Sequence, residues 1–306
     1  MKVLITGSNG FIGSTLTSKL KLTHTVIGHG RSSCNSLNTS DFLKVNIDSQ
    51  SNWKELLKGI NTIVHLAAVA HNNSNDPEYI SEVNVKGTIN LAEQAVKSGV
   101  KRFIFISSIG VVGNSTTNTL PFDEYSNAAA HSQYALSKLD AEIALLKIAE
   151  ETELEIVIIR PVLVYGVSAP GNFGKLVGLV NKVPMLPFGV CENKRSFISV
   201  ENLVDFIDVC ITHPSAKNEI FCISDGVDFS IKEFTNGIAV GLNKKLIQLP
   251  IPVFIFRLLG KITGKIEAVE QLVGDLQVDS SKARKLLSWT PPVTMAKTLS
   301  KLTNNK

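Results

Sequence analysis

The sequence predicts an α/β protein: a doubly wound parallel sheet with a smaller C-terminal lobe. Short apolar, β-branched runs alternate with helical stretches through the first half of the chain. A glycine-rich turn separates the first run from the first helical stretch. After Arg160, prolines and glycines break this rhythm into loops, which indicates a second, less regular part of the chain.

The expected elements of the first half follow one another as strand, helix, strand. Repeated units of this kind imply parallel strands, with ligands bound at the carboxyl ends of those strands. In the second half a helix and a strand return, over Ser199–Thr212 and Glu219–Ser224. The earlier strands are expected at Val3–Ile5, Thr25–Ile27, Leu43–Ile47, Thr62–Ala67, Arg102–Ser107 and Glu155–Arg160, and the earlier helices at Ser14–Leu20, Trp53–Leu57, Glu82–Ser98 and Tyr134–Glu150.

The glycine turn comprises Gly7, Gly10 and Gly13, spaced G-x-x-G-x-x-G between a buried strand and a helix. The first glycine permits a tight turn, the second lets backbone N–H groups approach a pyrophosphate, and the third allows close packing of helix on strand. The turn therefore predicts a dinucleotide site on a Rossmann-type sheet. We expect a dinucleotide-binding domain over residues 1–165 and about 195–225, and a substrate-binding lobe over about 166–194 and 226–306.

Composition and charge are those of a globular protein, with 44% hydrophobic and 19% charged residues. The net charge of +4 is spread along the chain without a Lys/Arg block, so no nucleic-acid partner is expected. The sequence predicts neither a membrane span nor a signal peptide. Four cysteines without C-x-x-C or metal-ligand spacing favour a reduced, cytoplasmic protein with no metal site: Cys34, Cys191, Cys210 and Cys222.

A tyrosine and a lysine four residues apart, Tyr134 and Lys138, share one face of an expected helix. A phenol ionises at about pH 10, and a nearby ammonium lowers that pKa, which suits the pair to proton transfer. Ser107 and Ser108 end an expected strand, where their hydroxyl groups can reach a bound ligand. Each feature alone is ordinary, but the order glycine turn, serine, Tyr-x-x-x-Lys indicates catalysis.

These motifs resemble those of the extended short-chain dehydrogenase/reductases, the NAD-dependent epimerase/dehydratase family. Within that family, the chain is similar to UDP-hexose 4-epimerases and UDP-4-keto-sugar reductases. The resemblance covers nearly the whole chain and rests on TGSNGFIG, HLAA, VNVKGTINL, SSIGVVG, YALSK, RPVLVYG, RSFISVENLVD and VDSSKARKLLSWTPP. Together these motifs are specific for the family and weakly specific for the substrate.

The resemblance implies a role for each matching residue. Tyr134 is the expected acid–base residue, Lys138 its partner and a ribose ligand, and Ser108 the third catalytic residue. The residues expected at NAD or NADP are Gly7, Asn9, Gly10, Phe11, Ile12, Gly13, Arg31, Asn46, Ile47, Leu66, Ala67, Ala68, Asn84, Ser107, Tyr134 and Lys138. Those expected at the substrate are Ser108, Asn172, Phe188 and Arg195, with the Arg195 guanidinium on the diphosphate.

The chain departs from the family pattern at several positions. Leu163 stands where an asparagine contacts the substrate, and no arginine in Ile266–Leu276 matches a second phosphate ligand. The acidic residue expected after the second strand is absent, and Arg31 follows instead. Because an arginine in that setting accommodates the 2′-phosphate of NADP, Arg31 either selects NADP or is a solvated loop residue.

The resemblance implies hydride transfer at C4 of a nucleotide-linked hexose. The first expectation is a 4-epimerase of UDP-glucose or UDP-N-acetylglucosamine that works through a 4-keto intermediate. One alternative is an NAD(P)H-dependent 4-ketoreductase of a UDP-4-keto-6-deoxy-hexose, giving a product such as UDP-N-acetylquinovosamine. The others are a 4-epimerase of a polyprenyl-diphosphate sugar and a non-catalytic dinucleotide-binding regulator. Dehydration is set aside, because Ile109-Gly110 replaces the acidic pair that it needs.

Three further expectations concern the oligomeric state, one apolar segment and the polar residues near the site. The resemblance implies a homodimer through the helices Glu82–Ser98 and Tyr134–Glu150. The segment Leu246–Lys265, apolar with three evenly spaced basic residues, is expected to be a helix buried against the second lobe, the alternative being an interfacial membrane helix. His65 is expected to be a packed strand residue, and the weaker candidates to line the site are His71, His131, Asp123 and Glu124.

Overall fold

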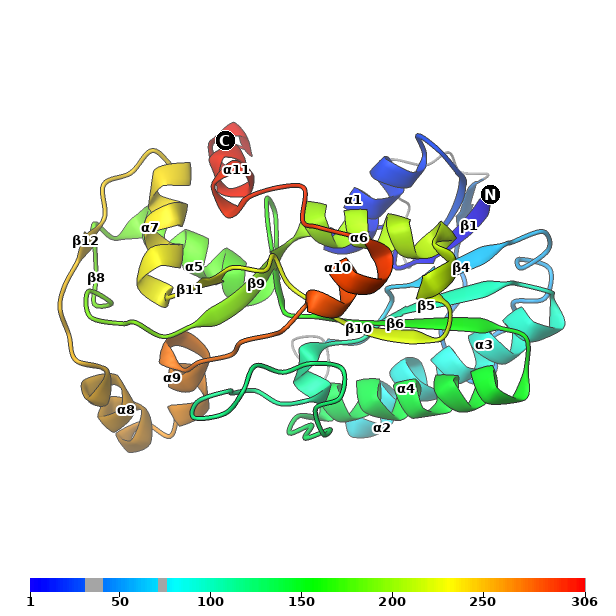
Figure 1. The fold of residues 1–306 in the computed structure, drawn as a ribbon, viewed down its shortest axis with the longest axis horizontal. Helices are drawn as coiled ribbons and strands as arrows, with labels where there is room; N and C mark the ends of the chain where they lie inside the picture. The colour runs from blue at the N-terminus through cyan, green and yellow to red at the C-terminus, as the bar shows by residue number, and fades with distance from the viewer. Residues whose placement is uncertain (31–40, 71–75, 306) are drawn as a thin grey trace.

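The computed structural model describes residues 1–30, 41–70 and 76–305, and its centre is a seven-stranded sheet (Figure 1). The strand order is β10-β6-β5-β4-β1-β2-β3, and every neighbouring pair is parallel. The sheet grows outwards from β1 in both directions, so the predicted doubly wound α/β fold is confirmed. Its strands are β1 (Lys2–Thr6), β2 (Thr25–His29), β3 (Phe42–Leu43), β4 (Thr62–His65), β5 (Arg102–Ile106), β6 (Glu155–Pro161) and β10 (Glu219–Ile223).

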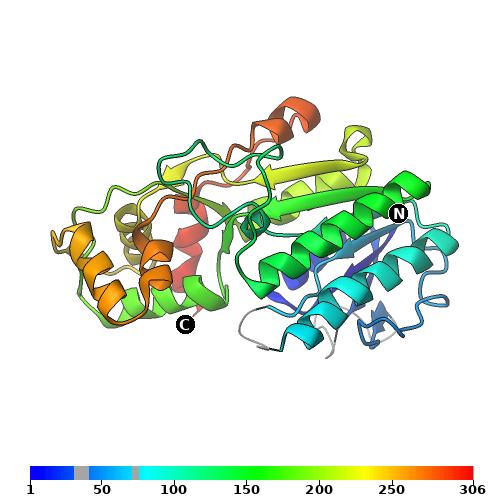
Figure 2. The same cartoon turned by 90° about the horizontal axis from the view of Figure 1, so that it is seen from below.

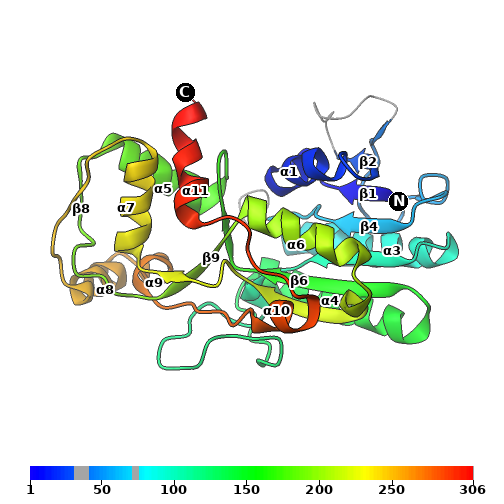
Figure 3. The same cartoon turned by 45° about the horizontal axis from the view of Figure 1, so that its top comes forward.

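Alternate side chains of each strand enter two different cores, one on each face of the sheet. Val3 and Ile5 join the core under α1 and α6, whereas Leu4 between them joins the core under α3 and α4. Figure 3 shows α1 and α6 on one side of the strands and α3 and α4 on the other. Because both faces are buried, these strands are almost continuously apolar. The helices are α1 (Phe11–Leu20), α3 (Gly87–Lys97), α4 (Gln133–Glu151) and α6 (Val200–Thr212).

A smaller lobe lies beside this sheet, on the left in Figure 2. Its core is an aromatic cluster in which the Phe197 ring stacks on Phe234 at 4.1 Å and Tyr165 meets Phe234 edge-on at 5.5 Å. Two small sheets, β11-β9-β7 and β12-β8, hold the lobe together. Its elements are β7 (Leu163–Tyr165), α5 (Gly171–Lys182), β8 (Met185–Leu186), β9 (Arg195–Ser199), β11 (Asp228–Phe229), α7 (Ile231–Gly241), β12 (Ile247–Gln248), α8 (Val253–Ile262), α9 (Ile266–Val273) and α11 (Met295–Leu299).

The chain returns from this lobe to the main sheet near its C-terminus. Helix α10 (Ser281–Leu287) packs against β10, where Lys282 pairs with Glu219 at 2.7 Å and donates to the Ile220 carbonyl at 2.8 Å. The sequence assigns this helix to the substrate-binding lobe, whereas the structure seats it against the large sheet.

Three local predictions differ from the structure. The third strand is expected over Leu43–Ile47 but pairs only as β3, and the helix expected over Trp53–Leu57 is a series of turns. Trp53 is fully buried, so packing rather than helical periodicity places its apolar side chain. Helix α8 forms as expected, but only one of its sides packs against the lobe, and its apolar residues Phe254, Leu258 and Ile262 are exposed. None of the described helices is long and apolar enough to cross a bilayer.

Candidate active site

The glycine turn joins β1 to the first turn of α1 and brings two backbone segments into contact. Gly7 has a φ of +71°, which favours glycine, and the Gly10 N–H donates to the Gly7 carbonyl at 3.0 Å. A Cβ on Gly13 would lie 2.1 Å from the Gly7 carbonyl oxygen, so no side chain fits there. Because these glycines carry no side chains, a ligand can approach the backbone N–H groups at the N-terminus of α1. The turn therefore fits a dinucleotide pyrophosphate.

A cavity of about 820 Å³ runs from the glycine turn to the smaller lobe. Its walls include the ends of β1, β5 and β6 on one side and α5, β9 and α9 on the other. The cavity thus opens at the carboxyl ends of the parallel strands, where this fold binds its ligands. Thirteen of the predicted site residues line it: Gly7, Gly10, Phe11, Ile12, Gly13, Leu66, Ser107, Ser108, Tyr134, Lys138, Asn172, Phe188 and Arg195.

The other predicted cofactor residues that the structure describes do not line the cavity. Asn9 lies against Gly30, since a Cβ on Gly30 would be 2.6 Å from the Asn9 amide oxygen. Ala67 donates its N–H to the Thr6 hydroxyl at 3.3 Å. Arg31 lies outside the described residues. The cavity wall does not include Asn46, Ile47, Ala67, Ala68 or Asn84.

The two serines after β5 differ in their bonding. The Ser108 hydroxyl accepts the Gly110 N–H at 3.1 Å and caps the short 3-10 helix Ile109–Val111. The Ser107 hydroxyl is buried and has no hydrogen-bond partner among the described residues. A buried polar atom without a hydrogen-bond partner lowers the stability of the folded protein. Because Ser107 lines the cavity, its hydroxyl is available to form a hydrogen bond with a polar ligand bound there.

Lys138 is a buried ammonium at the bottom of the cavity, with 2% of its surface exposed. Its Nζ donates to the Ile106 carbonyl at 2.8 Å and lies 4.5 Å from the Phe105 ring centroid. Burial lowers the pKa of this ammonium to about 7, against a smaller opposing effect of the Glu142 carboxylate. Lys138 is therefore close to losing its proton at neutral pH.

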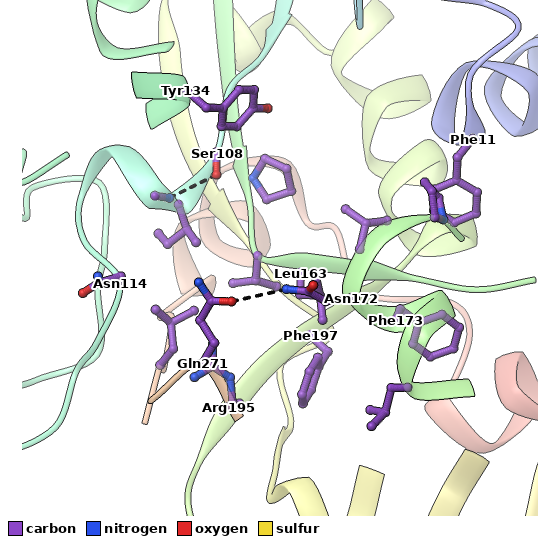
Figure 4. Close-up of a pocket in the computed structure, with 18 of the residues that line it drawn as sticks. Phe11, Ser108, Asn114, Tyr134, Leu163, Asn172, Phe173, Arg195, Phe197 and Gln271 are labelled. Atoms are coloured by element: carbon purple, nitrogen blue, oxygen red, sulfur yellow. Dashed lines mark hydrogen bonds between the residues drawn. The ribbon is translucent and has the colours of Figure 1, made fainter. Parts of the chain in front are cut away.

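Tyr134 lies half-buried in the same wall, one helical turn before Lys138. Its ring centroid is 5.8 Å from the Lys138 ammonium, and burial raises the pKa of the phenol to about 12. Figure 4 shows Tyr134 and Ser108 next to each other, with Asn172, Gln271 and Arg195 across the cavity from them. The tyrosine, serine and lysine predicted from separate motifs thus meet at one place.

Two buried polar networks hold the helix that carries Tyr134 and Lys138. Asn84 exchanges two hydrogen bonds with the Val69 backbone, at 2.8 and 3.0 Å, and also donates to the Ser137 hydroxyl at 3.0 Å. One turn after Lys138, the Glu142 carboxylate pairs with the Arg160 guanidinium at 2.6 Å. Both ions of that pair are buried, which ties α4 to β6.

The opposite wall carries the predicted substrate residues. The Arg195 guanidinium donates to the Gly274 carbonyl at 3.0 Å, and burial lowers its pKa to about 10, so it keeps its charge at neutral pH. Asn172, in the first turn of α5, donates to the Gln271 side chain at 3.3 Å. Phe188 is buried between the cavity and the Phe256 ring, 5.9 Å away. Arg195 and Asn172 make this wall polar, the Arg195 guanidinium contributes a positive charge, and Phe188 adds an apolar surface.

Several lining residues were not predicted from the sequence. Lys175 lies one turn after Asn172 on α5 and adds a second cation to this wall. Gln271 and Leu272 come from α9 and Leu179 from α5, and no local motif marks them. The only available signal was the helical spacing of Asn172, Lys175 and Leu179, which places them on one side of α5.

His65 and those weaker candidates that the structure describes do not line the cavity. His65 is fully buried between the Thr6 and Thr88 hydroxyls, at 2.8 and 3.0 Å, as a packed strand residue. The Glu124 carboxylate accepts the Cys222 N–H at 2.7 Å on another part of the molecule, and burial raises its pKa. Neither Asp123 nor His131 lines the cavity, and His71 is outside the described residues.

A dinucleotide cradle beside a Ser/Tyr/Lys site defines a nicotinamide-dependent enzyme of the short-chain dehydrogenase type. Residues 3–224 match the model of the NAD dependent epimerase/dehydratase family. The chain belongs to this family, and the prediction of an NAD-dependent enzyme is confirmed.

Two curated relatives and one solved structure cover most of the chain. A "UDP-glucose 4-epimerase" of Vibrio cholerae is 43% identical over 96% of this chain and 92% of its own length. An "N-acetyl-alpha-D-glucosaminyl-diphospho-ditrans,octacis-undecaprenol 4-epimerase" of Escherichia coli O157:H7 is 28% identical over 88% of this chain and 83% of its own length. The structure of a UDP-glucose 4-epimerase with UDP-glucose from Thermotoga maritima superimposes with a TM-score of 0.77, at 24% identity, covering 99% of this chain and 97% of that one.

The glycine cradle is testable by adding one methyl group. Gly13→Ala places a Cβ against the Gly7 carbonyl and 2.8 Å from the Ser8 Cα, so the turn must open. We expect the dissociation constant for NAD, measured by calorimetry, to rise about tenfold or more, equivalent to about 1.4 kcal/mol. The control is Gly178→Ala on α5, where a Cβ meets nothing within 4 Å and NAD affinity stays unchanged. Unchanged affinity in Gly13→Ala would contradict a pyrophosphate at this turn.

Proposed function

We propose that the protein is a 4-epimerase of nucleotide-linked hexoses, UDP-glucose or UDP-N-acetylglucosamine among them. The observation that carries this proposal is the meeting of Ser108, Tyr134 and Lys138 in one cavity, between a dinucleotide cradle and a cationic wall. The 43% identical relative, described as a UDP-glucose 4-epimerase, supports the same function. The fold alone supports the family and does not distinguish its substrates.

Tyr134 acts as the acid–base residue at the C4 hydroxyl of the hexose. It takes the hydroxyl proton as the sugar is oxidised at C4. After the 4-keto sugar has rotated so that its opposite face is towards the cofactor site, Tyr134 returns the proton to the C4 oxygen. Bound NAD supplies reversible hydride acceptance at C4. Ser108 lies beside the phenol and holds the C4 oxygen by a hydrogen bond, which fixes the distance over which the proton moves.

Lys138 is the described group that can favour ionisation of the phenol. Without ligand, burial keeps the phenol protonated and its pKa at about 12. The Lys138 ammonium, 5.8 Å from the ring, favours the phenolate by its charge, and this attraction is strong because little water reaches it. Glu142 raises the pKa of Lys138 and so helps to keep that ammonium charged.

The cationic wall binds the diphosphate. Arg195 supplies a charge-assisted donor, and Lys175 and Asn172 supply further donors from the first turns of α5. Lys175 takes the place of the second arginine that the sequence lacks. Phe188 offers an apolar surface for the nucleoside base at this end of the cavity.

A second substrate carrier is also supported. Leu163, Leu179 and Leu272 are each 39–40% exposed and line the cavity, so its rim is apolar where the family pattern has an asparagine. The 28% identical relative is described as acting on an undecaprenol-diphosphate sugar. A polyprenyl-diphosphate hexose is therefore the alternative substrate, and a 4-ketoreductase acting on the same C4 remains the alternative reaction.

The function is tested by incubating the enzyme with UDP-hexoses, with a polyprenyl-diphosphate hexose and with UDP-4-keto sugars, and by identifying the products by NMR. Tyr134→Phe removes the proton-transfer group and should lower kcat by about 10²-fold or more, while NAD still binds. Tyr125→Phe makes the same change at a tyrosine that is 85% exposed and outside the cavity wall, so it is the matched control and should leave kcat unchanged. Turnover of Tyr134→Phe near that of the wild type, or no C4 product from any sugar, would exclude the proposal.

For the choice of cofactor we propose that Arg31 admits NADP beside NAD. No carboxylate follows β2 to bind the ribose hydroxyls, since Gly30 stands at its end. Arg31→Ala should raise the dissociation constant for NADP⁺ by about tenfold, the effect of losing one charge-assisted contact, and leave that for NAD⁺ unchanged. Equal effects on both dinucleotides, measured by calorimetry, would mean that Arg31 does not touch the 2′-phosphate.

We also propose a homodimer in the cytoplasm, formed through α3 and α4. Ile143 is 59% exposed and Leu136 38% exposed on α4, which provides an apolar face for an isologous contact. Light scattering at micromolar concentration should give twice the mass of 33.2 kDa, and Ile143→Glu should shift it to one chain. A wild-type protein that is monomeric under these conditions would contradict the dimer.

The buried thiols of Cys191, Cys210 and Cys222 form no disulfide, as expected in a reducing compartment.

A further inference from the structure

Helix α8 carries an exposed apolar face. Phe254 is 67%, Leu258 54% and Ile262 72% exposed, and their four-residue spacing places them in one stripe along the helix. Leu259, 54% exposed, widens this stripe. Isolated apolar residues are common on surfaces, but four large ones on ten residues of helix form a patch that is normally covered.

A basic stripe runs beside the apolar one. Arg257 and Lys261 lie four residues apart on α8, Lys265 follows in the turn between α8 and α9, and all three are exposed. Neither Lys261 nor Lys265 forms an ion pair with any residue that the structure describes, whereas Arg257 pairs with Glu270 at 2.8 Å. From Lys244 to Lys265 the sequence holds five basic residues and no acidic one.

The remaining face of α8 fixes its orientation. Gly260 is buried against α9, where a Cβ would lie 2.9 Å from the Val269 side chain. Phe256 packs towards Phe188 in the cavity wall. The helix is therefore attached to the lobe by one side, and its apolar and basic stripes project outwards together. Figure 1 shows α8 at the outer end of the smaller lobe, at the opposite end of the molecule from α3.

We infer that α8 is a peripheral membrane-docking helix that rests on an anionic phospholipid surface. An apolar stripe with flanking lysines and arginines is the arrangement of a helix that lies in the plane of a bilayer interface. The side chains of Phe254, Leu258 and Ile262 enter the acyl boundary, and Lys261 and Lys265 meet the anionic headgroups.

The charge of the patch favours a membrane over a second copy of this chain. Two copies joined by this face would bring Lys261 and Lys265 of both chains into one interface with no carboxylate of α8 to pair with them, which is unfavourable. An anionic bilayer instead complements both stripes at once. The helix also has only ten residues, so it lies on the membrane and does not span it.

Docking would place the cavity close to the bilayer. Helix α9, which packs against α8, contributes Ala268, Gln271 and Leu272 to the cavity wall. A membrane under α8 therefore lies next to the apolar rim of the cavity. This inference does not depend on whether the substrate carrier is a nucleotide or a lipid.

The test is flotation of the whole protein with phosphatidylcholine vesicles, with and without phosphatidylglycerol, at low and high salt. The wild type should float with the phosphatidylglycerol vesicles at low salt. Leu258→Glu/Ile262→Glu should reduce the bound fraction about tenfold or more, because the apolar stripe no longer inserts. Lys261→Gln/Lys265→Gln should weaken binding to the anionic vesicles by about fivefold for each charge and reduce its salt dependence. Leu22→Glu, at a site 83% exposed after α1, is the control and should bind as the wild type does.

Turnover of a UDP-hexose in solution should be the same in all these variants, which shows that they fold and separates this test from that of the proposed function. A wild type that stays with the protein fraction at low salt overturns the inference. So does equal flotation of Leu258→Glu/Ile262→Glu and the wild type. Concentration-dependent self-association that this variant abolishes, without vesicle binding, would assign the face to a second copy instead.

Discussion

The active site depends on one buried charge, the ammonium of Lys138. Transfer of a charged group out of water is unfavourable unless other groups compensate. Here the ammonium donates to the Ile106 carbonyl and lies over the Phe105 ring, and the Glu142 carboxylate favours its charge, but these do not offset the cost of burial. The unfolded lysine keeps its proton up to about pH 10, whereas the folded one loses it near pH 7. Burial of this group therefore lowers the free energy of unfolding of the ligand-free protein at and below neutral pH. The destabilisation becomes smaller as the pH rises from about 7 towards 10.

The surroundings of Lys138 are rigid enough to maintain this unfavourable position. The buried Glu142–Arg160 pair joins α4 to β6, and Asn84 joins the same helix to the backbone at Val69 through Ser137. Separating the two ions of a buried pair would leave each charge without its partner, which costs free energy. The pair therefore resists movement of α4 relative to β6. The consequence is a site arranged before substrate arrives, with the Tyr134 phenol and the Lys138 ammonium already in place.

The sequence predicted what depends on local spacing and not what depends on how the lobe folds back. Three motifs are each defined within a few residues: the glycine turn, the serines after β5 and the Tyr-x-x-x-Lys helix. The parallel sheet brings them together, because its strands end at the same edge. Lys175, Gln271 and Leu272 were missed, because α5 and α9 meet across the cavity only through tertiary packing. The same reason explains two errors. Trp53 is held by the core rather than by a helix, and α8 has the composition of a buried helix but packs on the lobe with only one side, so Phe254, Leu258 and Ile262 stay exposed.

The carboxylate of Asp225 has a consequence for how ligands enter. It accepts hydrogen bonds from the Tyr165 hydroxyl at 2.7 Å, from the Ser199 N–H at 3.1 Å and from the Asn202 amide at 2.7 Å. Tyr165 and Ser199 end two strands of the lobe, and Asn202 lies in the helix under the main sheet. One side chain thus cross-links the two halves at the junctions where a hinge would have to bend, because β9 runs directly into α6. Opening the cleft by bending at this junction would break these three hydrogen bonds of the Asp225 carboxylate, so the junction resists such a movement.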